Sequence, residues 1–218
     1  FFLCRRSPDR LVQTVVDLCR TRLPDKMGIP AGQIQVLTPT RKGETGTVSL
    51  NRALQAALNP PSPGKRQKAW GDMIFRVGDR VMQTRNNYDV LWEKDDGEAG
   101  SGIFNGDVGR IVFLDGKERT LSVRYDDRVV PYDFEELDEL TPAYAISIHK
   151  SQGSEYPAVV IPLMMQHYVL LQRNLVYTGV TRGKKLVVLV GDRKALAVAV
   201  RNNKIRHRYT WLAHRLAG

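Results

Sequence analysis

Residues 149–155 bring His, Lys, Ser, Gln and Glu side chains together within seven positions of the chain, HKSQGSE. The apolar run AVVIPL follows at 158–163 and is predicted to be a buried strand. Polar side chains beside such a strand are typical of the functional loops that gather at one edge of a parallel α/β sheet. They offer hydrogen bonds and charge to a bound ligand. A solvated helix end with a cap is an equally good interpretation of this segment alone.

Arg182 is the second candidate, because it stands at the end of a predicted helix, 169–180, and is followed by GKK. Helical spacing aligns Leu175 and Gly179 on one side, and Arg182 comes just beyond them. A planar guanidinium with a permanent charge can stabilise a phosphoryl group during transfer. A cation that only interacts with the helix dipole is the commoner case for such a position.

The third candidate is the stretch TPTRKGETG, 38–46, between a predicted strand at 34–40 and a predicted helix at 47–58. Backbone amides that open a helix can hold an anion, and this stretch offers two glycines and two cations as well. It lacks the spacing G-x-x-x-x-G-K-[ST], and no such phosphate-binding loop occurs in the chain.

The elements around these candidates alternate between strands and helices. Predicted strands are 1–4, 34–40, 157–163 and 185–192, and predicted helices start at 7–8, 47, 169 and 193. The first helix is expected to end at Pro24 and Gly28. Residues 141–152 permit either a helix from Thr141 or an extended start with only 149–152 helical. Apolar strands between helices predict a parallel α/β sheet covered on both faces.

Charge divides the chain into two parts. Residues 76–140 hold 9 Lys/Arg and 16 Asp/Glu, whereas the other 153 residues hold 24 and 7. Short β-like runs with turns between them predict a small barrel in the acidic part, with a local basic edge at Arg80 and Arg85. The basic remainder predicts a polyanionic partner, most often nucleic acid or nucleotide. A surface charge that only confers solubility is the alternative.

Composition excludes other classes. No run approaches 18 apolar residues, so no membrane span and no membrane partner are expected. Cys4 and Cys19 match no metal or redox spacing and are predicted to be buried thiols in a reducing cytosol. The opening FFLCRRSPDR is no signal peptide and has no initiator Met, so we expect a fragment of a longer protein.

In this order, the three stretches resemble the superfamily 1 DNA helicases of the RecD type, the bacterial group that includes the exodeoxyribonuclease V alpha subunit. IHKSQGSEY resembles motif V, VYTGVTRGKK resembles motif VI, and VLTPTRKGETGTVSLNRALQ resembles the segment leading into motif IV. The likeness runs from residue 1 to about residue 216. It implies a RecA-like motor domain of the P-loop NTPase type without Walker A, residues 1–75 and 141–218, and an inserted SH3-like barrel, residues 76–140.

The resemblance also implies roles. ATP and Mg²⁺ would bind between two RecA-like domains, held mainly by an N-terminal domain that this chain lacks, and Arg182 would be the arginine finger. The nucleotide side would comprise Gly153, Glu155, Arg182 and Arg41. On the DNA side, Thr38 and Pro39 would face the single strand, and His149, Lys150, Ser151 and Gln152 would lie toward the DNA backbone or couple it to ATP. Implied partners are single-stranded DNA, the N-terminal domain and other exodeoxyribonuclease V subunits, in the bacterial cytoplasm, with 5′ to 3′ movement.

Two other functions stay open at this point. A non-catalytic nucleic-acid-binding module would need no arginine finger, and Arg182 would then be a surface cation. A nuclease is disfavoured, since the basic part has only 7 acidic residues and no carboxylate cluster at metal-binding spacing. On the helicase interpretation, the isolated chain is expected to lack ATPase activity and to bind DNA weakly.

Overall fold

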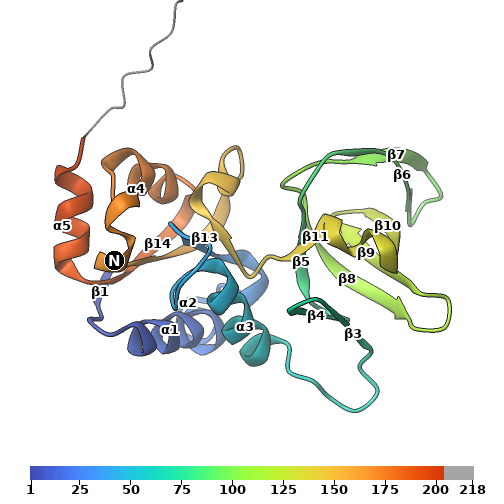
Figure 1. Cartoon of the computed structure of the whole chain (residues 1–218), viewed down its shortest axis with the longest axis horizontal. Coiled ribbons are helices and arrows are strands. Elements are labelled where there is room, and N and C mark those ends of the chain that lie inside the picture. The colour runs from blue at the N-terminus through green and yellow to red at the C-terminus, as the bar shows by residue number, and fades with distance from the viewer. Residues whose placement is uncertain (204–218) are drawn as a thin grey trace, which may run out of the picture.

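The computed structural model describes residues 1–203, and 204–218, the end of the predicted motor domain, lie outside the described residues. In residues 1–203, five parallel strands form one sheet in the order β1-β14-β13-β2-β12. Their bounds are β1 (Phe2–Cys4), β2 (Ile34–Thr38), β12 (Ala145–Ser147), β13 (Tyr156–Leu163) and β14 (Gly183–Gly191). The predicted parallel sheet is confirmed (Figure 1).

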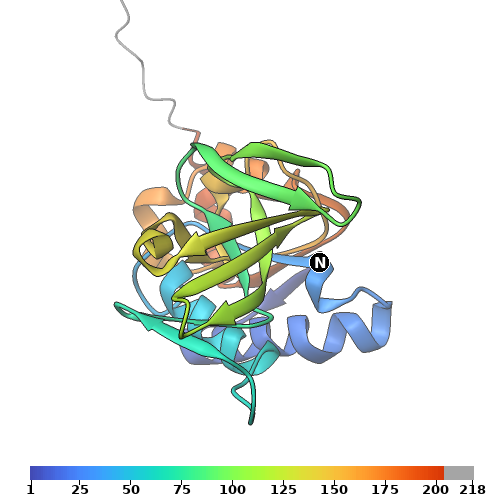
Figure 2. The same cartoon turned by 90° about the vertical axis from the view of Figure 1, so that its right-hand side faces the viewer.

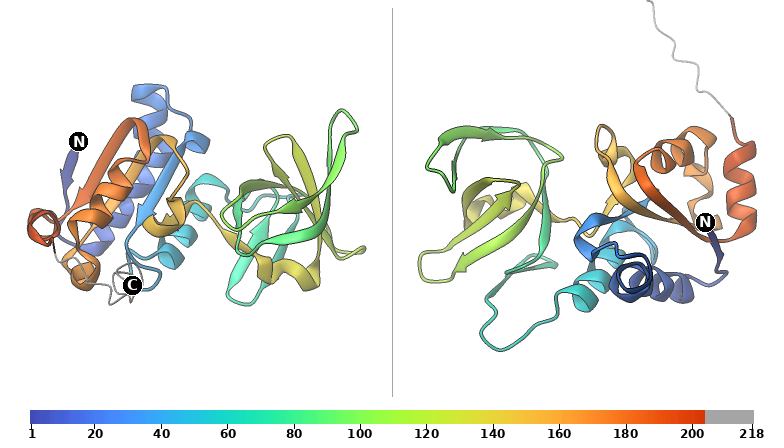
Figure 3. Two further views of the ribbon diagram at one scale, coloured as in Figure 1. Left: turned by 90° about the horizontal axis from the view of Figure 1, so that it is seen from above. Right: turned by 180° about the vertical axis from the view of Figure 1, so that it is seen from behind.

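Helices cover both faces of this sheet, as the apolar strands predict (Figure 3, left). Along β13, Ala158 and Val160 pack toward α1 (Pro8–Asp17) and α3 (Thr47–Leu58). Their neighbours Val159 and Ile161 pack toward α4 (Arg173–Val180) and α5 (Arg193–Arg201), because side chains alternate along a strand. Among residues 1–203, no helix combines the length and apolar character needed to cross a membrane.

The first helix passes through Pro24 instead of ending there. A π-helical turn, η1 (Leu18–Arg22), follows α1, and Pro24 occupies the first turn of α2 (Leu23–Met27). Proline is tolerated there because its missing N–H has no intrahelical partner to lose. Gly28 ends the helix as predicted, with φ +63° in the left-handed region.

Two predicted segments differ from the structure in their details. The helix predicted at 169–180 starts only at Arg173, because Met165–Leu170 forms a 3₁₀ turn, η5. The fully buried Leu171 lies between this turn and the helix. The extended alternative for 141–148 is confirmed by β11 (Leu140–Pro142) and β12, which lead into a 3₁₀ turn, η4 (Ile148–Ser151). Of the two free thiols, Cys19 is buried as predicted, whereas Cys4 is exposed.

A second unit, which we call the β module (residues 67–142), projects from the α/β host (Figures 1 and 2). Within the described chain it holds a seven-stranded sheet, a two-stranded hairpin and a 3₁₀ turn, η3 (Phe134–Glu139). The sheet strands are β5 (Arg80–Gln83), β6 (Asn87–Lys94), β7 (Ala99–Ile103), β8 (Val108–Asp115), β9 (Thr120–Tyr125), β10 (Arg128–Asp133) and β11, and the hairpin strands are β3 (Gln67–Trp70) and β4 (Met73–Arg76). Phe75 of the hairpin is fully buried in the module core, so module packing begins before the predicted border at residue 76.

The buried carboxylate of Asp79 joins the module to the host. It is 1% exposed and accepts hydrogen bonds from Gln55 Nε2 of α3 (2.5 Å) and from Nδ2 of Asn59 (2.6 Å), the residue that follows α3. It also accepts from the Arg76 backbone N–H (2.8 Å) and the Tyr144 hydroxyl (2.9 Å). A buried charge is tolerated only when its acceptor positions are filled, so these donors fix how the module sits on α3.

We expect Asp79→Ala to lower the free energy of unfolding by about 3 kcal/mol or more, because the four donors lose their shared acceptor. Asp89→Ala, a change at an exposed carboxylate of β6, is the matched control and should stay within about 0.5 kcal/mol of the wild type. Denaturant unfolding followed by tryptophan fluorescence measures both. Equal losses in the two variants would show that Asp79 does not hold the junction.

Candidate functional site

Arg182 lies at the edge of the sheet where β13 and β14 begin. Its guanidinium donates to Ser154 O, Thr178 O and Thr181 Oγ1, each at 3.1 Å. The Tyr156 N–H in turn bonds to Arg182 O at 2.8 Å, which ties the start of β13 to the end of α4. In the described part of the chain, these partners are neutral oxygens and none is a carboxylate. The positive charge is therefore held in place without being neutralised.

Gly153 and Glu155 lie at the same edge. Gly153 has φ +85° with open space where a side chain would stand, so the turn needs glycine for its backbone angle and leaves the surface clear. Glu155 pairs with Lys184 at 3.1 Å, and both side chains are more than half exposed. An exposed pair of this kind contributes little to stability, so Glu155 can change partners readily.

Arg41 is not brought to this edge. It follows the carboxyl end of β2, whereas Arg182 precedes the amino end of β14, and the strands are parallel. A strand of the length of β2 separates the two edges by about 16 Å. The structure thus separates Arg41 from the other residues assigned to the nucleotide side.

The loop that carries Arg41 bonds to itself. The Thr47 N–H donates to Thr40 O (3.0 Å) and the Val48 N–H to Arg41 O (3.3 Å). These two amides lie at the start of α3 and already have backbone acceptors. Neither is therefore free to bind the anion considered for this stretch. The side chains of Arg41 and Lys42 remain exposed.

Thr38 and Pro39, which the resemblance places at a DNA strand, are both buried in the α/β host. Thr38 is 0% exposed and its hydroxyl donates to Thr45 O at 2.8 Å. Thr45 Oγ1 lies 2.8 Å from Nε2 of the buried His167, and the Met164 N–H bonds to His167 Nδ1. These bonds assign Nε2–H as the donor to Thr45. Thr38 and His167 therefore hold the loop in place from its buried side, and both do so through Thr45.

The turn η4 presents different side chains in two directions. Ser151 is 0% exposed and donates to Ile148 O, so its hydroxyl is engaged inside the turn and stabilises it. The exposed Lys150 reaches Asn105 Oδ1 of the β module at 3.2 Å. His149 and Gln152 instead line a cavity of about 130 Å³ beside α4, together with Leu170, Gln172, Asn174, Leu175 and Thr178.

A groove runs along the junction between α3, the β3–β4 hairpin and β11. Two adjoining cavities of about 470 and 390 Å³ share Arg41, Thr47, Asn51, Met73, Thr141 and Pro142. Arg52, Trp70 and Ile74 line one end, and Lys150 lines the other. We call this the seam groove. It combines cations with apolar and aromatic walls and also includes the carboxylates of Asp72 and Asp138. Its residues are too far apart in the sequence for a local motif to reveal it.

Two family models match the chain. Residues 50–125 match the model described as "ATP-dependent RecD-like DNA helicase SH3 domain", and residues 142–190 match the "UvrD-like helicase C-terminal domain". The first lies largely in the β module, and the second covers η4, β13 and α4 with most of β14.

Similar proteins carry related names. The chain is 39% identical over 168 residues to the ATP-dependent RecD2 DNA helicase of Deinococcus radiodurans, covering 77% of this chain and 21% of that protein. It is 30% identical over 170 residues to the RecBCD enzyme subunit RecD of Haemophilus influenzae, covering 77% and 23%. The Bacteroides Pif1 helicase, solved with ADP-AlF3 and ssDNA, aligns with a TM-score of 0.49 and 16% identity, over 97% of this chain and 50% of that one. The chain thus spans about a fifth to a quarter of the length of these curated relatives.

Burial lowers the pKa of His167 to about 4, from its ordinary 6.5. A depressed histidine pKa stabilises the fold above the unfolded value, and this contribution is lost as the pH falls from about 6.5 toward 4. We expect the wild type to lose about 2 kcal/mol of unfolding free energy between pH 7.5 and pH 5 from this group. His167→Gln should lack that loss, whereas His149→Gln, at an exposed position, should keep it. Chemical denaturation at both pH values measures the difference, and identical pH dependence in all three proteins would contradict the assignment.

Proposed function

The chain matches a RecD-like helicase SH3 domain and a UvrD-like helicase C-terminal domain, and we propose that it belongs to the RecD-like helicases and forms the C-terminal motor half of an ATP-dependent DNA helicase. The observation that carries the proposal is the position of Arg182. Its charge is fixed by neutral oxygens at an edge that it shares with Gly153 and Glu155. A half-site of this kind needs a second domain to complete it.

Arg182 fits the role of an arginine finger by its count of donors. A guanidinium has five N–H groups, and three hydrogen bonds hold this one, so two remain for a phosphate oxygen. In this proposal, ATP and Mg²⁺ are held mainly by the N-terminal domain. Arg182 approaches the γ-phosphate, while Gly153 and Glu155 line the nucleotide side.

Single-stranded DNA is proposed to occupy the seam groove. Cations that follow a backbone and aromatic rings that stack on bases are the usual features of such sites. Arg41, Arg52 and Lys150 supply the charge, and Trp70 supplies the ring. Arg41 thereby moves from the nucleotide side to the DNA side, and Thr38, Pro39 and Ser151 support the groove without touching the strand.

The turn η4 is proposed to couple the two sites, with His149 and Gln152 on its nucleotide side. These two residues share a cavity with Thr178, whose carbonyl also holds Arg182. On the other side of the turn, Lys150 lines the seam groove. Gly179 of α4 packs so closely on Ile161 and Ile148 that α4 and the turn must shift together. Closure of the two domains around ATP would be transmitted to the DNA through α4 and η4.

Further aspects of the proposal follow the family resemblance. The relatives named RecBCD enzyme subunit RecD support exodeoxyribonuclease V subunits as partners, and the RecD2 relative supports a helicase that acts without them. The resemblance also implies 5′ to 3′ movement and a place in the bacterial cytoplasm. The motor domain would be interrupted by an SH3-like barrel.

Arg182→Ala, introduced into the full-length protein, should lower DNA-stimulated ATP hydrolysis by about 10³-fold, since arginine fingers contribute that much or more. Lys185→Ala, at an exposed cation of β14, is the matched control and should retain the wild-type rate. A loss of only two- to threefold, on the same order as small local perturbations, would favour the non-catalytic binding module. The 218-residue chain alone should show no ATPase activity, and a clear rate from it would contradict the half-site.

Trp70→Ala should weaken binding of an oligothymidylate by about 5- to 100-fold, because a stacked base contributes about 1–3 kcal/mol. Lys150→Gln should lower the slope of log affinity against log salt by about 0.7, the value for one phosphate contact on a single strand. Fluorescence anisotropy at several salt concentrations measures both. Lys117→Gln, on the exposed β8–β9 turn, should change neither quantity. If Trp70→Ala and Lys117→Gln bind equally well, the strand does not occupy the seam groove.

A further inference from the structure

Arg80 and Arg110 form a pair of like charges at the junction of host and module. They stand directly opposite each other on β5 and β8, in antiparallel register. Like charges at opposed positions destabilise a sheet. The other residue of the predicted basic edge, Arg85, has Asp138 and Glu139 as ion-pair partners. Within residues 1–203, no ion pair includes Arg80 or Arg110.

Each guanidinium is positioned by backbone carbonyls. Arg80 Nη1 donates to Gly32 O and Ile34 O at 3.3 Å, and Arg110 Nη1 donates to Gly78 O at 2.8 Å. Among the described residues, Nε and Nη2 of both arginines have no hydrogen-bond partner. A side-chain carbon placed on Gly32 would lie 3.6 Å from Arg110 Nη2, so Gly32 lies beside the exposed end of Arg110, while Arg80 is half-buried.

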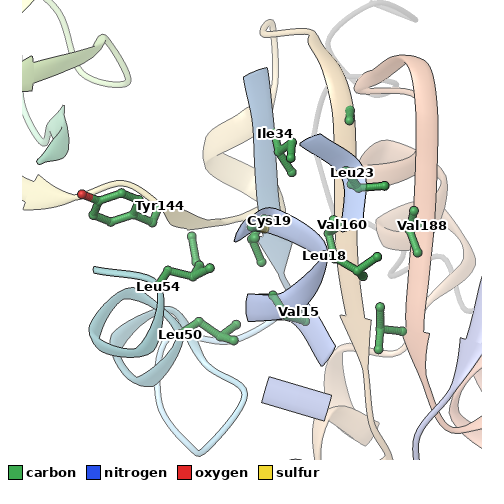
Figure 4. Packing of buried hydrophobic residues seen from close by; sticks show 14 of the residues in the cluster. Val15, Leu18, Cys19, Leu23, Ile34, Leu50, Leu54, Tyr144, Val160 and Val188 are labelled. Carbon is green, nitrogen blue, oxygen red and sulfur yellow. The ribbon is translucent and has the colours of Figure 1, made fainter. Parts of the chain in front are cut away.

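The two arginines line a cavity of about 100 Å³ whose walls are partly polar and partly apolar. Figure 4 shows four of the wall residues, Cys19, Ile34, Leu54 and Tyr144, around the region where the host meets the module. Burial and the neighbouring Arg110 lower the pKa of Arg80, which reflects the cost of enclosing the charge. Burial raises the pKa of the Cys19 thiol to about 12, so the thiol stays neutral and cannot balance the arginines.

We propose that this cavity binds a single phosphate group. Two planar guanidinium forks match the oxygens of one phosphate, and a dianion balances both charges. The cavity is too small for a base or a nucleoside, which restricts the ligand to the phosphate itself. The phosphate comes from free orthophosphate or from a polynucleotide backbone. The site lies outside the seam groove and does not include Arg182, so it does not rest on the proposed helicase function.

The first test compares thermal unfolding of the 218-residue chain in sodium phosphate and in sodium chloride of equal ionic strength. Phosphate should raise the wild-type midpoint further than chloride does, because a ligand that binds only the folded state stabilises it. Arg110→Gln should weaken the fitted phosphate affinity by about tenfold or more, the effect of losing hydrogen bonds to a charged group. Lys117→Gln should respond like the wild type. Equal shifts in phosphate and chloride for the wild type would overturn the proposal.

The second test introduces a carboxylate at residue 32, where it can take the place of the phosphate. Gly32 has no strained backbone angle, and a side chain there meets Arg110 at ordinary contact distance. Gly32→Asp should raise the midpoint in chloride and remove the additional effect of phosphate, whereas the neutral Gly32→Asn should retain that effect. A Gly32→Asp protein that still responds to phosphate like the wild type would contradict the site.

The source of the phosphate is decided by affinity for an oligothymidylate of about 15 nucleotides, a length typical of single-strand sites. Weaker binding by Arg110→Gln than by Lys117→Gln would assign the cavity to a nucleic-acid backbone. Equal binding by both variants, with the phosphate effect still dependent on Arg110, would assign it to free orthophosphate.

Discussion

Four hydrogen bonds to one buried carboxylate, that of Asp79, determine the relation between the two units of this protein. Taking a charge out of water is costly, and here two side-chain amides, a backbone N–H and a tyrosine hydroxyl offset that cost together. The donors come from the host, from the module and from the segment that returns between them. Both the seam groove and the Arg80–Arg110 cavity depend on this junction, because each is lined by residues of host and module.

The host gathers its other polar groups at the two edges of one parallel sheet. Arg182, Gly153 and Glu155 lie where β13 and β14 begin, whereas Arg41 lies where β2 ends. A segment that connects these edges must cross a face of the sheet. Among the connections between the described host strands, the one from β12 to β13 is the shortest. The 3₁₀ turn in that segment packs on α4 and reaches toward the module, which explains why so many polar side chains are concentrated there.

Long apolar strands and well-bounded helices were predictable from sequence, and the helix at 47–58 has the predicted bounds. The HKSQGSE segment and Arg182 each come just before a predicted strand. Because these two strands pair in the sheet, the two segments lie side by side. Sequence could not give side-chain direction, so Thr38 and Ser151 were assigned to DNA although both hydroxyls bond inside the fold. His167, Trp70 and Arg110 were missed as site residues because their partners come from distant segments, and the resemblance assigned Arg41 by order along the chain.

The module meets the host through a junction with little freedom, and its β6–β7 hairpin projects from the side away from the host (Figure 1). A module joined in this way moves together with the host. A rotation of the α/β host by a few degrees therefore produces a much larger displacement at the hairpin tip than at the Arg182 edge. Within the described residues, the hairpin is thus well suited to report a movement of the host to whatever lies beside it.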